Sequence, residues 1–168
     1  MNPNRAVSID KVVVHMGVGE AGDRLVSAET ILTEITGNKP IRGVAKQTLP
    51  AFGLRKGQPL SCKTTLRGSN AEKFLETSLK AVGNKLSDRA IDKQGNFSFG
   101  VEEHTDYPGQ SYDPKIGIFG LDVTVVVRRN GVRIARRHIQ TKKLPLKQRV
   151  SHEDTTAFLS GKFGVEVQ

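Results

Sequence analysis

Cysteine is almost absent from this sequence, and so are the features of secreted and membrane proteins. Cys62 is the only cysteine among 168 residues, which excludes a disulfide framework and a cysteine-based zinc site. No apolar run approaches the length of a membrane span, and the start, MNPNRAVSID, has no apolar core that could act as a signal peptide. These absences predict a soluble, cytoplasmic protein that does not contact a membrane.

Acidic residues are missing from a long central stretch. No Asp or Glu lies between Glu34 and Glu72. An ordinary solvated surface mixes both signs of charge, so an acid-free basic stretch indicates a surface that faces a polyanion. A solvated lysine-rich face is the plainer alternative, but arginine binds phosphate in a bidentate manner and favours nucleic acid. The basic residues of this stretch are Lys39, Arg42, Lys46, Arg55, Lys56, Lys63 and Arg67.

The positive charge of the chain is confined to two segments. The formal net charge is +9 and the isoelectric point is about 9.9. Residues 45–68 carry five basic residues and residues 128–150 carry nine, with no acid in either segment, while the rest of the chain sums to −5. This distribution predicts an RNA-binding protein. In the second segment the predicted RNA contacts are Arg128, Arg133, Arg136, Arg137, Lys142 and Lys143.

The apolar pattern predicts one α+β domain over residues 1–168. Alternating or β-branched runs predict strands over 9–16, 41–45, 60–67, 97–101 and 121–129. Helical spacing predicts a helix over about 23–36, one with a capping box at Ser69 and Glu72, and a short one capped by Ser151 and Asp154. Pro50, Gly53, Gly57 and Pro59 predict an exposed basic loop at 45–59.

The dipeptide Asn130-Gly131 predicts a tight turn between two strands. It favours a type I′ turn and therefore a basic β-hairpin over 121–139, with Val132 to Ile139 as the second strand. In such a hairpin Arg128 would lie opposite Arg133. Like charges in that position repel each other unless an anion covers them.

A glycine motif at residues 17–22, GVGEAG, leaves an enzyme as the alternative function. It fits the pattern GxGxxG between a predicted strand and a predicted helix, as a nucleotide-binding turn requires. The acidic residue expected about 20 positions later is missing, and the chain has no repeated βαβ units. A plain strand-to-helix turn is the favoured interpretation, and a helix N-terminus that points at an RNA phosphate is a third.

An acidic segment around His104 is the only other candidate for chemistry. Its residues could hold a metal or act as an acid–base pair, but proximity in sequence does not ensure convergent geometry, so a solvated loop is favoured. No catalytic residue, metal or cofactor is predicted. The segment contains Glu102, Glu103, His104, Asp106 and Asp113.

Three long motifs resemble one protein family. They are KVVVHMGVGEAG, ITGNKPIRGVAKQTLPAFGLRKGQPLSCKTTLRG and YDPKIGIFGLDVTVVV. Together they are similar to the large-subunit ribosomal protein L-five family in its archaeal form, and the resemblance covers nearly the whole chain. It implies an α+β fold in which helices cover one face of an antiparallel-rich sheet and leave the other face for RNA.

The resemblance also implies partners. The chain would be a monomer within the central protuberance of the large ribosomal subunit, bound to 5S rRNA and 23S rRNA. There it would lie beside ribosomal protein L-eighteen and bridge to small-subunit protein S-thirteen. The loop from Thr48 to Gly57 would approach the P-site tRNA. A structural protein of this kind catalyses nothing.

The resemblance assigns particular residues to these contacts. His15, Asn38 and Thr65 match the family's 5S rRNA positions, although the family usually has asparagine in place of His15 and glutamine in place of Asn38. Phe52 could stack on a base or anchor the loop to the body of the protein. The complete rRNA-binding set from this end of the chain is His15, Asn38, Lys39, Arg42, Lys46, Gln47, Lys63, Thr65 and Arg67, and the tRNA-contact set is Thr48, Phe52, Arg55, Lys56 and Gly57.

Overall fold

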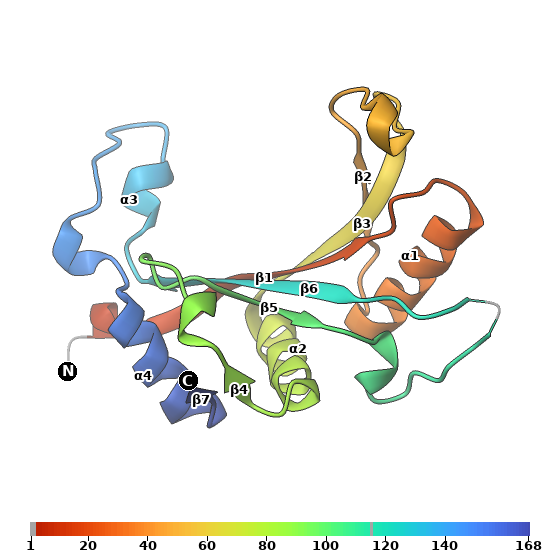
Figure 1. Ribbon diagram of the computed structural model, residues 1–168. Helices are drawn as coiled ribbons and strands as arrows, with labels where there is room; N and C mark the ends of the chain where they lie inside the picture. Colours follow the sequence, from red (N-terminus) through yellow and green to blue (C-terminus); the bar gives the residue numbers. More distant parts are fainter. Residues whose placement is uncertain (1–2, 115) are drawn as a thin grey trace. The chain divides into compact units, whose positions relative to one another are not determined.

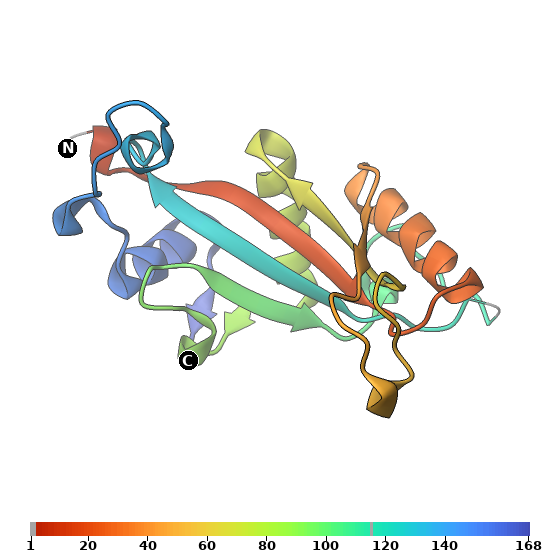
Figure 2. The same cartoon turned by 90° about the horizontal axis from the view of Figure 1, so that it is seen from above.

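A five-stranded antiparallel sheet organises the chain, in the order β2-β3-β1-β6-β5 (Figures 1 and 2). The computed structural model describes residues 3–114 and 116–168. The strands of this sheet are β1 (Val7–Gly17), β2 (Ile41–Val44), β3 (Pro59–Leu66), β5 (Phe97–Val101) and β6 (Leu121–Arg129). A separate parallel pair consists of β4 (Lys85–Leu86) and β7 (Glu166–Val167). The predicted α+β class is confirmed.

Helices accompany the strands in the described residues. They are α1 (Asp23–Thr36), α2 (Gly68–Ala81), α3 (Arg133–Arg136) and α4 (His152–Phe163). Short 3₁₀ turns are η1 (Pro3–Arg5), η2 (Pro50–Phe52), η3 (Asp88–Ala90), η4 (His104–Asp106) and η5 (Leu146–Gln148). In the part of the chain that the structure describes, no helix is both long and apolar enough to cross a bilayer.

The chain has two compact units, which are described separately. The first unit contains Met1–Val12, Arg67–Phe99 and Thr124–Gln168, and the second contains Val13–Leu66 and Gly100–Val123. Strands β1 and β6 therefore contribute residues to both units. The single domain expected over 1–168 stays a prediction.

The buried positions of the sheet alternate as the sequence predicts. In β6 the side chains of Leu121, Val123, Val125 and Val127 are buried, while Asp122, Thr124 and Arg128 are exposed. In β3, Cys62, Thr64 and Leu66 are buried, while Lys63 and Thr65 are exposed. Each of these strands therefore has one apolar face and one polar face, as period-two side-chain geometry requires.

Cys62 is a core residue. Its side chain is fully buried in β3, and burial raises the pKa of the thiol to about 11. The charge of the nearby Glu29 carboxylate is the smaller cause of the same increase in pKa. Because the thiolate is the reactive form, Cys62 is inert at neutral pH.

The two predicted capping boxes have different outcomes. The box at Ser151 is confirmed, because its hydroxyl accepts a hydrogen bond from the Asp154 amide and the Asp154 carboxylate accepts one from the Ser151 amide. The box at Ser69 is wrong. Helix α2 begins at Gly68, with Arg67 as an N-cap that makes no side-chain cap, and Glu72 instead pairs with Lys162 of α4 at 2.7 Å.

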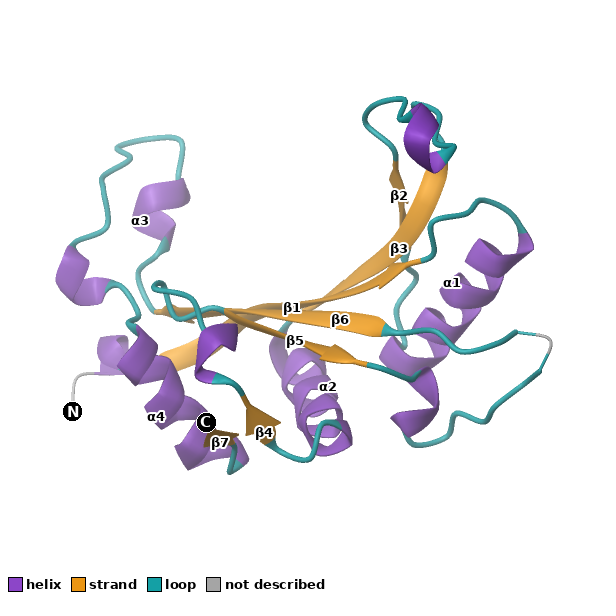
Figure 3. Ribbon diagram, viewed as in Figure 1, coloured by secondary structure: helices purple, strands orange, loops and turns teal. Residues whose placement is uncertain are grey.

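The predicted β-hairpin over 121–139 is not formed. Strand β6 ends at Arg129, and the residues that follow form α3 and a loop (Figure 3). Strand β6 already lies between β1 and β5 in the sheet. A strand has only two hydrogen-bonding edges, so β6 has none left for a hairpin partner. The cross-strand pair of Arg128 and Arg133 therefore does not exist.

Candidate nucleic-acid interface

The β2–β3 loop of the second unit is held by its own hydrogen bonds. The amides of Leu49 and Leu54 each donate to the carbonyl of the other, at 2.9 and 3.1 Å. The Ala45 amide donates to the Gln58 carbonyl at 2.9 Å, and the Gly57 amide returns to the Ala45 carbonyl at 2.9 Å. These bonds close the loop into a compact finger with η2 at its tip (Figure 1).

The predicted tRNA-contact residues have different roles in this finger. Phe52 lies at the tip with 76% of its surface exposed, so it does not anchor the loop to the body of the protein. Arg55 and Lys56 are also exposed. The Thr48 hydroxyl accepts a hydrogen bond from the Lys56 amide at 3.1 Å and therefore shapes the loop. Gly57 has a positive φ of 86°, which a glycine adopts without strain.

The exposed sheet face of the second unit brings together part of the predicted rRNA set. Lys63 and Thr65 are exposed on β3, and His15 is half-buried on β1. Asp122 was not expected on the same face, where its carboxylate lies 3.4 Å from Nδ1 of His15. This face is therefore mainly, but not entirely, free of acid.

Arg42 is already bound within the protein. Its guanidinium pairs with both carboxylate oxygens of Glu29 on α1, through Nε and through Nη2, the latter at 2.9 Å. This hydrogen bonding lowers the pKa of Glu29 and raises that of Arg42. Asn38, beside the end of α1, is half-buried, and its amide donates to the Thr36 hydroxyl at 3.4 Å. Arg42 therefore joins β2 to the middle of α1, and the backbone amide of Asn38 stabilises the end of that helix.

In the first unit, three predicted RNA contacts converge on one carboxylate. Arg67, Arg128 and Arg136 each direct Nη1 at Asp10 of β1, at 3.4, 3.1 and 3.2 Å. The Asp10 side chain is only 3% exposed, whereas those of the arginines are 60%, 45% and 59% exposed. The cluster therefore keeps an excess of two positive charges at the surface. We call these four residues the Asp10 cluster.

Helix α3 delivers Arg136 to this cluster. The chain after α3 folds back on it, because the Lys142 amide donates to the Ile134 carbonyl at 3.2 Å and the Arg137 Nε donates to the Gln140 carbonyl at 2.9 Å. One donor of the Arg137 guanidinium is thus already hydrogen-bonded within the loop. Other predicted contacts of this segment are exposed, namely Arg133, Lys142 and Lys143.

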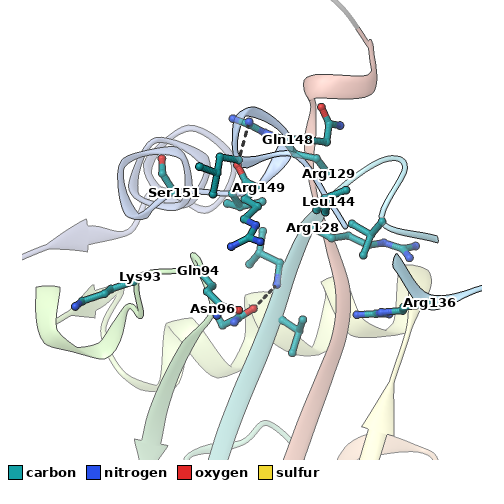
Figure 4. A pocket seen from close by; sticks show the side chains of 15 residues that line it. Lys93, Gln94, Asn96, Arg128, Arg129, Arg136, Leu144, Gln148, Arg149 and Ser151 are labelled. Atoms are coloured by element: carbon teal, nitrogen blue, oxygen red, sulfur yellow. Dashed lines mark hydrogen bonds between the residues drawn. The ribbon is translucent and has the colours of Figure 1, made fainter. Parts of the chain in front are cut away.

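A groove of about 720 Å³ opens beside the cluster in the first unit. It lies among residues 93–96, the end of β6, α3 and residues 144–151 (Figure 4). Arg129 fixes the segment 147–149, part of which lines the groove. Its Nη1 donates to the carbonyls of Lys147 and Arg149, both at 3.2 Å, and its Nη2 pairs with Asp154 at 2.7 Å. Although burial alone would raise the pKa of Asp154, hydrogen bonds from Ser151 and the charge of Arg129 make the pKa lower than normal.

The glycine motif at 17–22 is a structural turn. The amides of Val18 and Gly19 both donate to the Leu60 carbonyl, at 3.1 and 2.9 Å. Gly22 is the N-cap of α1 with a φ of 118°. Since β1 and β6 are neighbours in an antiparallel sheet, the repeated βαβ context of a dinucleotide site is missing from the described fold.

The acidic segment does not assemble a site in the described part of the chain. His104 is buried, its Nδ1 accepts a hydrogen bond from the Phe119 amide at 3.3 Å, and its ring meets the Phe119 ring edge-on. Among residues 3–114 and 116–168, no group of three or more His, Cys, Asp and Glu side chains could hold a metal ion.

Sequence reasoning missed Asp10 and the groove. One signal was present: Asp10 interrupts the apolar alternation of Val12, Val14 and Met16 on the buried face of β1. A buried carboxylate at such a position needs cationic partners. The groove has no such signal, because its walls come from four separate segments of the sequence.

Together, the antiparallel sheet and the exposed cationic surfaces define a basic α+β protein suited to an anionic polymer. Two family comparisons agree with this class. The family "Ribosomal protein L5" matches residues 2–55, and the C-terminal region of the same ribosomal family matches residues 59–152. The chain belongs to the ribosomal protein L5 family.

Relatives in archaea share the whole length of the chain. "Large ribosomal subunit protein uL5" of Methanospirillum hungatei JF-1 is 76% identical over 168 residues, which is 100% of both chains. The protein of the same name in Methanoregula boonei is 61% identical over 164 residues, or 98% of this chain and 99% of its own. That of Methanoculleus marisnigri is 54% identical over 167 residues, or 99% and 100%. The chain is therefore a structural constituent of the large ribosomal subunit.

Proposed function

We propose that this protein binds 5S rRNA and 23S rRNA in the central protuberance, contacts the P-site tRNA and bridges to the small-subunit head. Its protein neighbours would be L-eighteen in the large subunit and S-thirteen in the small subunit. It would act as a monomer and catalyse no reaction. Family membership supports the setting, and the surface chemistry of the chain supports the RNA contacts.

One observation carries this proposal. Lys46, Arg55, Lys56 and Lys63 are exposed, and none of them has a carboxylate within salt-bridge distance in the described residues. Unpaired surface cations repel one another and are favourable when a phosphate backbone neutralises them. The predicted division is that the sheet face binds 5S rRNA and the finger contacts tRNA.

The sheet face is suited to shape recognition rather than to reading a duplex sequence. His15 and Thr65 offer short polar groups that can reach 2′-hydroxyls and loop bases, and Lys63 offers a cation for the backbone. Arg42 contributes indirectly, because its pairing with Glu29 fixes β2 to α1. The proposed direct contacts of the second unit are therefore His15, Lys39, Lys46, Gln47, Lys63 and Thr65.

Footprinting of 5S rRNA with the purified chain tests the partner. We expect the protein to protect one continuous region of 5S rRNA from hydroxyl radicals, because a folded protein surface covers neighbouring riboses. The Lys63→Ala/Thr65→Ala variant should lose part of that protection, and a Lys80→Ala variant on the outside of α2 should not. An unprotected 5S rRNA at saturating protein would contradict the proposal.

The finger can be tested apart from the sheet face. Replacing Arg55 and Lys56 with alanine should leave affinity for 5S rRNA within about twofold and weaken P-site tRNA binding to reconstituted ribosomes about tenfold, because two phosphate contacts are lost only there. Filter binding measures both affinities. An equal loss of both would contradict the division of labour. A Phe52→Leu variant keeps the finger's apolar tip and reports whether ring stacking contributes.

A further inference from the structure

The Asp10 cluster is a cationic site whose geometry is set inside the protein. Each of Arg67, Arg128 and Arg136 turns one terminal nitrogen, Nη1, toward Asp10. A guanidinium has five N–H donors, so most donors of the three groups point elsewhere. Within the described residues, no other carboxylate lies within salt-bridge distance of them. Three cations gathered around one anion form a surface that attracts a further anion.

The adjacent groove extends this surface. Arg128 and Arg136 belong both to the Asp10 cluster and to the groove wall, and Lys93 and Arg149 lie around the same pocket (Figure 4). Among the residues that the structure describes, no Asp or Glu lines it. Leu144 and the 79% exposed Leu146 give one wall an apolar surface. The groove therefore offers charge for a phosphate and apolar area for a ring or a ribose.

We propose that this groove binds an unpaired nucleotide of ribosomal RNA, with its phosphate on Arg128 and Arg136 and its base or ribose against Leu144 and Leu146. Asp10 is a positioning residue, because it holds the arginines together without reaching the groove itself. This inference rests on the proposed function, since it names a second RNA contact on the first unit of the same protein.

The shape and chemistry favour a nucleotide in a single-stranded or loop segment. A duplex presents a convex row of phosphates, whereas a pocket of about 720 Å³ has room for an extruded base. Apolar side chains beside arginines are the usual setting for an unstacked base, because the base packs while its phosphate is neutralised. Exposed Leu146 also becomes buried in such a complex.

Paired variants test the arginines. Arg128→Ala/Arg136→Ala should weaken binding of the full-length chain to rRNA about tenfold to hundredfold, and should make the dependence of log affinity on log salt shallower by about 1.4 to 1.8. The matched control is Arg5→Ala/Arg89→Ala, which removes two exposed charges of the same unit outside the groove. The probes are 5S rRNA and 23S rRNA, each titrated separately. An equal loss of RNA affinity in the control variant and the test variant would overturn the proposal that the groove binds RNA.

Asp10→Asn separates positioning from simple charge. This variant adds one net positive charge, so if only charge mattered, RNA affinity would rise. If Asp10 positions the arginines, affinity should instead fall about two- to tenfold at unchanged fold, measured by circular dichroism. A rise in affinity would overturn the positioning role.

Tethered cleavage tests the location with all the arginines intact. Because Cys62 is buried and unreactive, a Gln94→Cys variant carries one accessible thiol at the groove rim for an iron chelate. We expect strand cleavage at a few neighbouring unpaired nucleotides of 5S or 23S rRNA. Cleavage of neither RNA by a bound, labelled protein would overturn the inference. If wild-type protein binds neither RNA, the proposed function itself fails. If wild-type protein binds RNA and the groove variants bind it equally well, only this inference is rejected.

Discussion

A Gly95→Ala variant is expected to lose about 2–5 kcal/mol of the free energy of unfolding. Gly95 is buried in the turn before β5 and has a φ of +78°, which L side chains rarely adopt. A Cβ there would lie 2.5 Å from Oγ1 of Thr155 and 2.6 Å from Cγ1 of Val150. About 1–2 kcal/mol comes from the left-handed backbone and about 1–3 kcal/mol from overpacking. Urea unfolding followed by circular dichroism measures the loss.

The turn has little freedom to relax around the new methyl group. The Thr155 hydroxyl donates to the Gly95 carbonyl at 2.9 Å, and the Asp92 carboxylate accepts from the amides of Gln94 and Asn96, both at 2.8 Å. A matched control is Gly161→Ala in α4, where nothing lies within 4 Å of the added Cβ. It should gain about 0.5–1 kcal/mol because alanine favours a helix. Similar changes in the two variants would contradict this account of Gly95.

Affinity for 5S rRNA is expected to fall about 250- to 1,000-fold as monovalent salt rises from about 50 to about 200 mM. If about six phosphates are neutralised, log affinity changes with log salt with a slope near −4 to −5, at about −0.7 to −0.9 per contact. The physical cause is the release of counterions from the RNA when lysine and arginine replace them. Fluorescence titration at fixed magnesium concentration measures this slope.

Single variants measure how much each residue contributes to the slope of log affinity against log salt. Lys63→Ala should make it shallower by about 0.7 to 0.9, because this exposed residue lies on the sheet face that we propose binds 5S rRNA. Lys80→Ala, in the last turn of α2, should leave it unchanged. A salt-independent affinity would show that phosphate neutralisation does not drive binding.

Elements with strong local patterns were predicted well. The helix over 23–36 and the capping box of α4 are present because apolar spacing and caps act within a few residues. The box at Ser69 failed because α2 begins at Gly68, with Arg67 as its N-cap, and glycine at 68 accepts the φ of 61° that this start needs. A shift of the N-cap by two residues, from Ser69 to Arg67, is enough to remove the capping box.

The candidate site was predicted less completely than the fold. Exposed cations such as Lys63 and Arg55 could be found from charge alone, since an acid-free segment must face water or an anion. The sequence could not show that Arg42, unlike these cations, is paired within the protein, because its partner Glu29 lies 13 positions away on a helix. Asp122 likewise reaches His15 only because β1 and β6 are neighbours in the sheet.

The sequence by itself determined the α+β class, the two basic segments and the family to which the chain belongs, because composition, periodicity and long motifs do not depend on which residues meet in space. Only the tertiary structure decided that β6 has no free edge for a hairpin and that three arginines meet at Asp10. The pairing of β1 with β6 and the Asp10 cluster join residues more than 50 positions apart, as for Arg67 and Asp10. No local pattern records that separation.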